Sequence, residues 1–226
     1  METSQNTAEV VNNHPDGKPE DWKIAEKLFE EYLNNKDIPF FRVDQEKYTK
    51  SKILREKGIC RPDYIIQTKN DYFCIDVKFR SKTDHDTSNE KRFIIDQKNI
   101  ISLYYFQEEF HQKTWLAYND NLQKTDFYYI SISKVYEYFI NILEAILGDN
   151  YFDYFNKLYH SLFTDKIKHK LWIYIPEILC FDQLSFDKGF YKESDKEFYK
   201  KEVDFYKSIW EDTITNIFFK GQNINK

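Results

Sequence analysis

The chain has 226 residues, of which 41% are hydrophobic and 19% aromatic, so it can bury a core and does not have the composition of a disordered polypeptide. Its formal net charge of -5 argues mildly against nucleic acid binding, because phosphate contacts depend on Lys and Arg. Between residues 47 and 98, however, basic residues outnumber acidic ones. The length predicts one domain, or one domain with an extension.

Cysteine content and hydropathy indicate the compartment. Cys60, Cys74 and Cys180 are odd in number and form no CxxC pair, so neither a disulfide framework nor a structural zinc site is predicted. The N-terminus lacks the apolar run of a secretory signal, and polar residues interrupt the longest apolar stretch, Val135 to Leu147. We therefore expect a cytoplasmic protein with no membrane span.

The N-terminal quarter of the chain predicts a tail, a helix and a strand. Residues 1–19 are polar, contain a turn signal at His14 to Gly17, and predict a flexible tail. From Glu20 to Lys36 apolar residues recur at helical spacing, which predicts an amphipathic helix. Ile38 to Val43 predicts a short strand, followed by a charged connector that ends near Gly58.

The middle of the chain predicts a hairpin, a helix and two more strands. The hairpin strands are Arg61 to Thr68 and Asp71 to Arg80, and a polar loop follows at residues 81–91. A helix is predicted over residues 96–111, with strands at 114–118 and 126–133. Beyond residue 134 the pattern predicts helices around 134–147, 150–163 and 196–218, and a strand at 171–175.

The second hairpin strand alternates between apolar and charged side chains. Phe73, Ile75, Val77 and Phe79 share one face, whereas Asp76 and Lys78 share the other. A turn at residues 69–70 places Asp63 opposite Asp76, and a turn at residues 70–71 places it opposite Lys78. In either register Asp63, Asp76 and Lys78 are predicted to share one face.

Two neighbouring carboxylates repel each other, and a divalent cation between them relieves that repulsion. Mg²⁺ prefers oxygen ligands and commonly uses one or two carboxylates together with substrate phosphate. The ammonium group of Lys78 beside them is suited to orient a water molecule and to offset charge that develops on a phosphate.

These residues resemble the signature of the PD-(D/E)xK nuclease superfamily, with Arg61-Pro62-Asp63 followed by Ile75-Asp76-Val77-Lys78. The resemblance implies a restriction endonuclease-like α/β core of order αβββαβ, with a mixed central sheet flanked by helices. It covers residues 20–135, which leaves 136–226 as a mainly helical extension packed on the core. It also implies that Asp63, Asp76 and the Val77 carbonyl hold the metal and that Lys78 is catalytic.

Two parts of this interpretation have alternatives. A DxK pattern also occurs at Asp16, Asp21 and Asp96, and a structural hairpin with an ordinary salt bridge would produce the same pattern. Glu26 resembles the family's additional acidic residue, both as a metal ligand and as a catalytic group. A solvated helix edge explains Glu26 equally well, and Glu30 could take its place.

Basic and amide residues near the hairpin are candidates for substrate contacts. Arg80, Lys82, Lys91 and Arg92 surround the proposed site, although exposed basic residues are usually only solvated. Gln97 and Lys98 open the predicted helix, a position at which some members of the family place a glutamine or a lysine.

The sequence therefore predicts a Mg²⁺- or Mn²⁺-dependent endonuclease that hydrolyses DNA phosphodiester bonds, in bacterial or phage defence or restriction. We expect it to need a homodimer or a partner protein to engage DNA. Two alternatives stay open. One is an RNase or structure-selective nuclease of the same fold, and the other is a non-catalytic nucleic-acid-binding or regulatory subunit.

Overall fold

The computed structural model describes residues 19–45, 50–67, 71–79, 92–156, 172–176, 200–207 and 210. The predicted tail, the hairpin turn, the loop at 81–91 and the outer parts of the two last predicted helices lie outside these residues.

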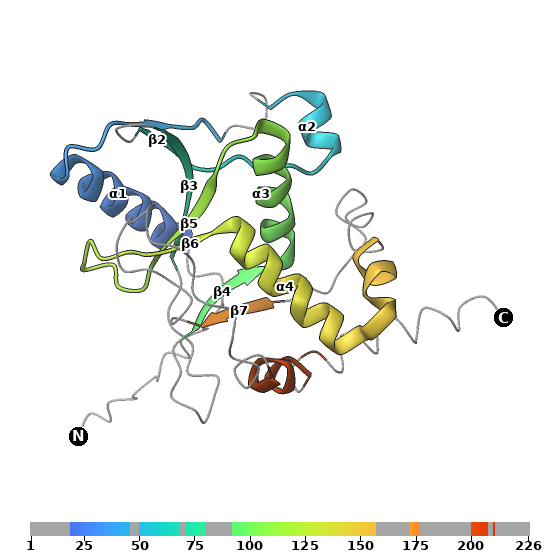
Figure 1. The fold of residues 1–226 in the computed structure, drawn as a ribbon. Coiled ribbons are helices and arrows are strands. Elements are labelled where there is room, and N and C mark those ends of the chain that lie inside the picture. Colours follow the sequence, from blue (N-terminus) through green and yellow to red (C-terminus); the bar gives the residue numbers. More distant parts are fainter. Residues whose placement is uncertain are drawn as a thin grey trace, which may run out of the picture.

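A five-stranded mixed sheet forms the centre of the described fold. Its strands are β1 (Phe40–Arg42), β2 (Tyr64–Gln67), β3 (Tyr72–Phe79), β5 (Thr114–Asn119) and β6 (Tyr128–Ser131). They are ordered β1-β2-β3-β5-β6, and only the β3–β5 pair is parallel. The predicted fold class, a mixed sheet flanked by helices, is confirmed (Figure 1).

In the described part of the chain, the sheet is accompanied by helices α1 (Pro19–Asn35), α2 (Lys52–Glu56), α3 (Gln97–Phe110) and α4 (Ile132–Leu147). The Asp96 carboxylate caps α3 and the Ser131 hydroxyl caps α4, each by accepting a backbone N–H of the first turn. Helix α2 was not predicted, because it is only five residues long and lies in a charged connector. Residues 151–156 and 200–207 are also helical.

The register of the β2–β3 hairpin is the first of the two predicted alternatives. Tyr64 pairs with Ile75 and Gln67 pairs with Tyr72, as expected for a turn at residues 69–70. This register places Asp63, the residue before β2, beside the middle of β3. The alternative with the turn one residue later is therefore wrong.

The two faces of the sheet pack against different helices, as Figure 1 shows. Phe73, Ile75 and Val77 of β3 pack with Ala25 and Phe29 of α1. On the opposite face, side chains of β5 and β6 pack with α3 and α4, in a cluster that includes Leu116, Tyr118, Ile130, Ile100 and Phe139. Because side chains alternate along a strand, Asp76 and Lys78 lie on the face that α3 covers.

A second, two-stranded sheet joins the predicted core to the predicted extension. Strand β4 (Arg92–Asp96) pairs antiparallel with β7 (Trp172–Pro176). The predicted strand at 171–175 is thereby confirmed. Strand β4 was missed, because all five of its residues are buried and therefore do not alternate in polarity.

Arg92 is part of the interior of this second sheet. Its two terminal guanidinium nitrogens each lie 2.7 Å from a carboxylate oxygen of Glu202, and the two side chains are only 3% and 2% exposed. The Tyr138 hydroxyl also donates to Glu202. The expectation that Arg92 is an exposed phosphate-binding residue is corrected, since its charge is already paired in the core. None of the helices in the described ranges is long and apolar enough to span a bilayer.

Candidate functional site

Asp63 lies against β3 because its carboxylate continues the hydrogen bonding of the hairpin. Its backbone N–H donates to the Ile75 carbonyl at 2.9 Å. Its Oδ2 accepts the Val77 backbone N–H at 2.7 Å. This contact extends the pairing of the two strands by one residue, because Asp63 lies just before the first residue of β2. The side chain is therefore held in place by a backbone group of the strand that provides the other two predicted site residues.

Asp76 and Lys78 project from that strand as an ion pair. The Lys78 Nζ lies 2.5 Å from Asp76 Oδ2, and the side chains are only 18% and 7% exposed. The low exposure distinguishes this pair from a solvated surface salt bridge. A structural hairpin that carries a salt bridge stays the alternative. The structure therefore brings Asp63, Asp76 and Lys78 together, as the hairpin pattern predicts.

The environment of Asp63 opposes its ionisation. Burial, followed by the nearby negative charge of Asp76, raises the pKa of Asp63 to about 8. The ammonium of Lys78 and the Val77 N–H act in the opposite direction but do not cancel these two causes. A cation placed between the two carboxylates would remove the conflict, so the electrostatics of this site suit a bound metal ion.

Replacing Asp63 by Asn is expected to stabilise the metal-free protein well above pH 8 and to have little such effect near pH 4. The unfolded carboxyl ionises near its ordinary pKa of 3.8, whereas the folded one retains its proton up to about pH 8, so wild-type stability falls as pH rises through this window. The gain should be on the order of 1 kcal/mol or more, because one pKa unit corresponds to about 1.4 kcal/mol.

Urea unfolding in EDTA at several pH values measures this difference. Adding Mg²⁺ should stabilise the wild type and leave the Asp63→Asn variant unchanged. If Asp63→Asn lowered the unfolding free energy by the same amount at every pH, the prediction would be contradicted.

Asp63 and Asp76 open onto a pocket with a volume of about 490 Å³. Gln45 donates to the Pro62 carbonyl at 2.8 Å and lies 3.5 Å from Asp63 Oδ1, so it helps to fix the approach to β2. Asn99 reaches the pocket from the first turn of α3. The pocket is lined by Gln45, Lys50, Arg55, Cys60, Arg61, Asp63, Asp76 and Asn99.

Five polar or basic residues of this pocket were not identified from the sequence: Gln45, Lys50, Arg55, Arg61 and Asn99. Arg61 was quoted only as part of the motif. The three basic ones lie between β1 and β2, in a stretch that has no periodic pattern. The excess of basic residues after residue 47 is the one sequence signal that could have indicated them.

Glu26 lies on α1, where its carboxylate forms an ion pair with Arg42. Arg42 also contacts Glu30 at 3.0 Å, and the Tyr64 hydroxyl donates to Glu30 at 2.9 Å. Glu26 is near enough to Asp63 to contribute slightly to its raised pKa. In the described part of the chain, however, no three His, Cys, Asp or Glu residues are grouped closely enough to hold a metal ion. A metal-binding or catalytic role for Glu26 stays a prediction.

The predicted substrate contacts are only partly described. Gln97 is buried at the start of α3 and Lys98 is exposed, and neither of these two residues lines the pocket with Asp63. Asn99, one residue further along α3, does line it. Arg80 and Lys82 lie outside the described residues.

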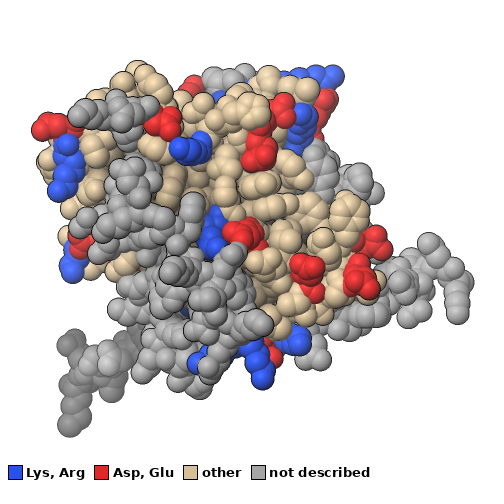
Figure 2. All heavy atoms as spheres, viewed as in Figure 1, with Lys and Arg blue, Asp and Glu red and all other residues tan. Residues whose placement is uncertain are grey.

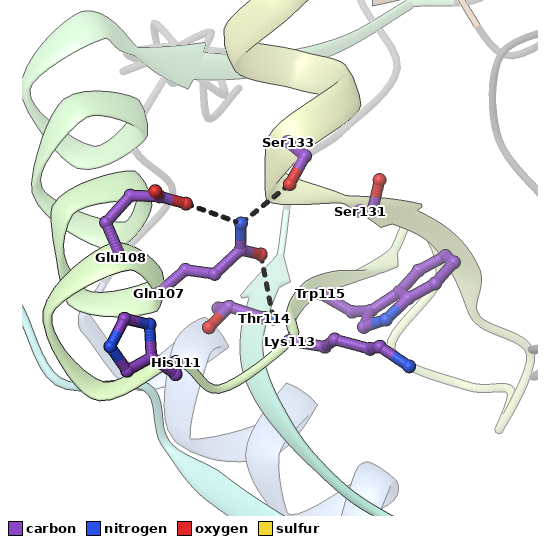
Figure 3. A pocket seen from close by; sticks show the side chains of 8 residues that line it. All are labelled: Gln107, Glu108, His111, Lys113, Thr114, Trp115, Ser131 and Ser133. Carbon is purple, nitrogen blue, oxygen red and sulfur yellow. Dashed lines mark hydrogen bonds between the residues drawn. The ribbon is translucent and has the colours of Figure 1, made fainter.

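A second pocket, of about 370 Å³, lies at the other end of α3 (Figure 3). Gln107 crosses it, donating to Ser133 Oγ at 2.7 Å and accepting the Thr114 N–H at 3.2 Å. This side chain joins α3 to both β5 and α4. Among the described residues, Glu108 is the only acid that lines this pocket, so they provide no pair of carboxylates like that of the first pocket.

The Gln107→Ala variant is expected to lose about 1–3 kcal/mol of unfolding free energy, because it leaves the buried Thr114 without its side-chain acceptor. Chemical denaturation measures this loss. Gln123→Ala, at an exposed position, is the matched control and should change stability little. Equal stability of the two variants would contradict a bridging role for Gln107.

Comparison with known proteins gives a likeness of structure and none of sequence. Neither the protein-family models nor the curated protein sequences match this chain. Among solved structures, the chain is similar to Hjc, a Holliday junction resolvase from Archaeoglobus fulgidus, with 15% sequence identity and a TM-score of 0.36. The similarity covers 49% of this chain and 77% of the resolvase.

Proposed function

We propose that this chain is a metal-dependent nuclease that hydrolyses DNA phosphodiester bonds, with Asp63, Asp76 and Lys78 as its catalytic group. One observation supports this most directly. Two carboxylates line one pocket and an ammonium group pairs with one of them, in an arrangement that leaves the other carboxylate reluctant to ionise in the absence of a cation. A hairpin that served only for stability would gain nothing from that conflict.

The donor set fits Mg²⁺ or Mn²⁺. The metal would be held by the carboxylates of Asp63 and Asp76, and two carboxylates are a common protein contribution to a magnesium site. A strand directs the N–H and C=O of one residue to the same side, so the Val77 carbonyl faces the side on which Asp63 accepts its N–H. This carbonyl is the proposed third ligand. A bound divalent ion would supply positive charge that activates water and stabilises the transition state.

Lys78 is the proposed electrophilic group. Its Nζ, held by Asp76, would lie beside the phosphate whose ester bond is broken. When water attacks phosphorus, the bond to the departing oxygen breaks and negative charge builds on the phosphoryl oxygens. A fixed ammonium group lowers the energy of that charge without having to reorganise.

The proposed substrate and setting follow from the charge distribution and from the family resemblance. Basic and acidic side chains are interspersed on the face drawn in Figure 2, and neither sign covers a large area of the described residues there. We therefore propose that a second copy of the chain or a partner protein helps to hold the DNA. The proposed setting is restriction or another bacterial or phage defence role, in the cytoplasm.

One assay tests this function. The purified chain is incubated with duplex DNA, single-stranded DNA and RNA of one sequence, with Mg²⁺, with Mn²⁺ or with EDTA. We expect cleavage of DNA in the presence of either ion and none in EDTA. Asp76→Asn should be inactive, whereas Asp71→Asn, an exposed acid on the same hairpin, should remain active.

The other outcomes decide between the remaining functions. Cleavage of RNA alone would replace the DNA substrate with RNA. Binding without cleavage under all conditions would overturn the enzymatic proposal in favour of a non-catalytic subunit. Equal cleavage by the wild type and Asp76→Asn would show that the activity does not come from this site.

A further inference from the structure

Three basic side chains line the pocket that contains Asp63 and Asp76, and Lys50 interacts electrostatically with the other two. Lys50 precedes α2, and Arg55 lies in the last turn of α2. Arg61 comes after the helix, two residues before Asp63. We call Lys50, Arg55 and Arg61 the basic wall. All three come from the connector between β1 and β2, so the same segment that leads to the first carboxylate also places these cations beside it.

The basic wall makes the pocket positive in a protein that is acidic overall. Three cations and two carboxylates line it, whereas the whole chain has a net charge of -5. Arg55 alone could be explained by its favourable position at the C-terminal end of a helix. That explanation does not extend to Lys50 and Arg61, which lie outside the helix and approach the same space.

The cations of the wall oppose one another electrostatically. Burial lowers the pKa of the half-buried Lys50, and the positive charges of Arg61 and Arg55 lower it further, while Cys60 acts in the opposite direction. Such a cluster is relieved by an anion, just as the neighbouring carboxylates are relieved by a cation. The pocket thus contains groups suited to a metal ion and groups suited to a phosphate.

We infer that the basic wall binds the sugar-phosphate backbone of a nucleic acid, at one or more phosphates next to the one held at Asp63, Asp76 and Lys78. This inference rests on the proposed function and deepens it by assigning the residues that position the strand. A nucleic acid supplies regularly spaced anions, so one strand can place one phosphate at the carboxylates and a neighbouring one at the cations. Lys50, Arg55 and Arg61 are positioning residues, and the chemistry belongs to the hairpin.

The test measures binding separately from cleavage. A fluorescein-labelled DNA duplex is titrated in EDTA with the Asp76→Asn protein, which cannot cleave it, over a range of salt concentrations. The same background then receives the wall variant, Lys50→Gln/Arg55→Gln/Arg61→Gln. The matched control variant, Lys113→Gln/Lys124→Gln/Lys207→Gln, removes the same number of charges at exposed positions outside the pocket.

We expect the wall variant to bind more weakly than the control variant and to reduce the slope of log K against log salt by about 2 to 3, since each phosphate contact contributes about 0.9. The exposed Arg55 offers a variant that does not disturb folding, and Arg55→Gln alone should reduce the slope by about 0.9. Equal slopes for the wall and control variants would overturn the inference. The variant Lys50→Arg/Arg55→Lys/Arg61→Lys keeps every charge and should keep the wild-type salt slope. A reduced slope in this variant would also overturn the inference.

Cleavage kinetics distinguish the failure of this inference from the failure of the proposed function. In an otherwise wild-type chain, the wall substitutions should raise KM while kcat changes little. If the wild type cleaves DNA and the wall variant does so with unchanged KM, the nuclease stands and the basic wall is wrong. If no variant cleaves but the salt slope still falls, the basic wall stands as a nucleic acid contact and the nuclease is wrong.

Discussion

DNA cleavage by the Lys78→Ala variant is expected to be slower by about 10²- to 10³-fold in kcat, the usual effect of removing one group that stabilises transition-state charge. The Mg²⁺ concentration needed for half-maximal activity should rise little, because Lys78 is not a proposed metal ligand. Single-turnover rates over a range of Mg²⁺ concentrations measure both quantities. Lys78→Arg should recover part of the rate, since it keeps the charge but moves it.

The matched control for Lys78 is Lys113→Ala. Lys113 also pairs with an aspartate of the hairpin, at 3.2 Å, but the two side chains are 68% and 51% exposed. We expect wild-type cleavage from this variant. If Lys78→Ala instead required far more Mg²⁺ and regained full kcat at saturation, its role would be to shape the metal site, and the proposed electrophilic function would be wrong.

The second large effect concerns stability. Replacing Glu202 by Ala is expected to lower the unfolding free energy by about 3–5 kcal/mol, because it leaves the buried guanidinium of Arg92 without its partner. Burial lowers the pKa of Arg92, and the variant lacks the Glu202 carboxylate that raises it in the wild type. A guanidinium nevertheless keeps its proton at neutral pH, so Arg92 cannot escape the penalty by becoming neutral. Urea denaturation measures the loss.

A double replacement separates the pair from its surroundings. Arg92→Met/Glu202→Leu removes both charges and should recover much of the stability lost by Glu202→Ala. Glu137→Ala, which removes an acid whose carboxylate is 46% exposed and lies 3.4 Å from Lys134, is the control and should change stability little. A double variant less stable than Glu202→Ala would contradict the unpaired-charge explanation, and would mean that Arg92 stabilises the fold through another contact, such as its position over the Phe205 ring.

The hairpin could be predicted because two local constraints agree. Alternation between Phe73 and Phe79 assigns each side chain to a face, and the short connection to β2 restricts the register to two choices. The fixing of Asp63 by the Val77 N–H could not be predicted, because it depends on β2 beginning one residue after Asp63. The sequence thus predicted that the three residues meet, and the structure supplied the contact that holds them.

Features that depend on distant segments were missed for a common physical reason. Strand β4 is buried on all sides by β7 and by the chain around Glu202, so its sequence shows no polar face. The basic wall is dispersed over a connector in which the described residues form one five-residue helix, and its members meet only after the chain folds. Arg92 was assigned to the surface because a buried partner over a hundred residues away leaves no local signal.

The hairpin register makes the length of its turn a determinant of the proposed activity. Because neighbouring side chains of a strand point to opposite faces, a slip of one residue between β2 and β3 would turn Asp63 toward α1 and separate it from Asp76. Insertions between the two strands can therefore be tolerated only if the extra residue protrudes from the tip. A loop graft at this position should preserve the protein if the β2–β3 pairing stays unchanged. A graft that shifts this pairing should abolish the proposed activity without unfolding the protein.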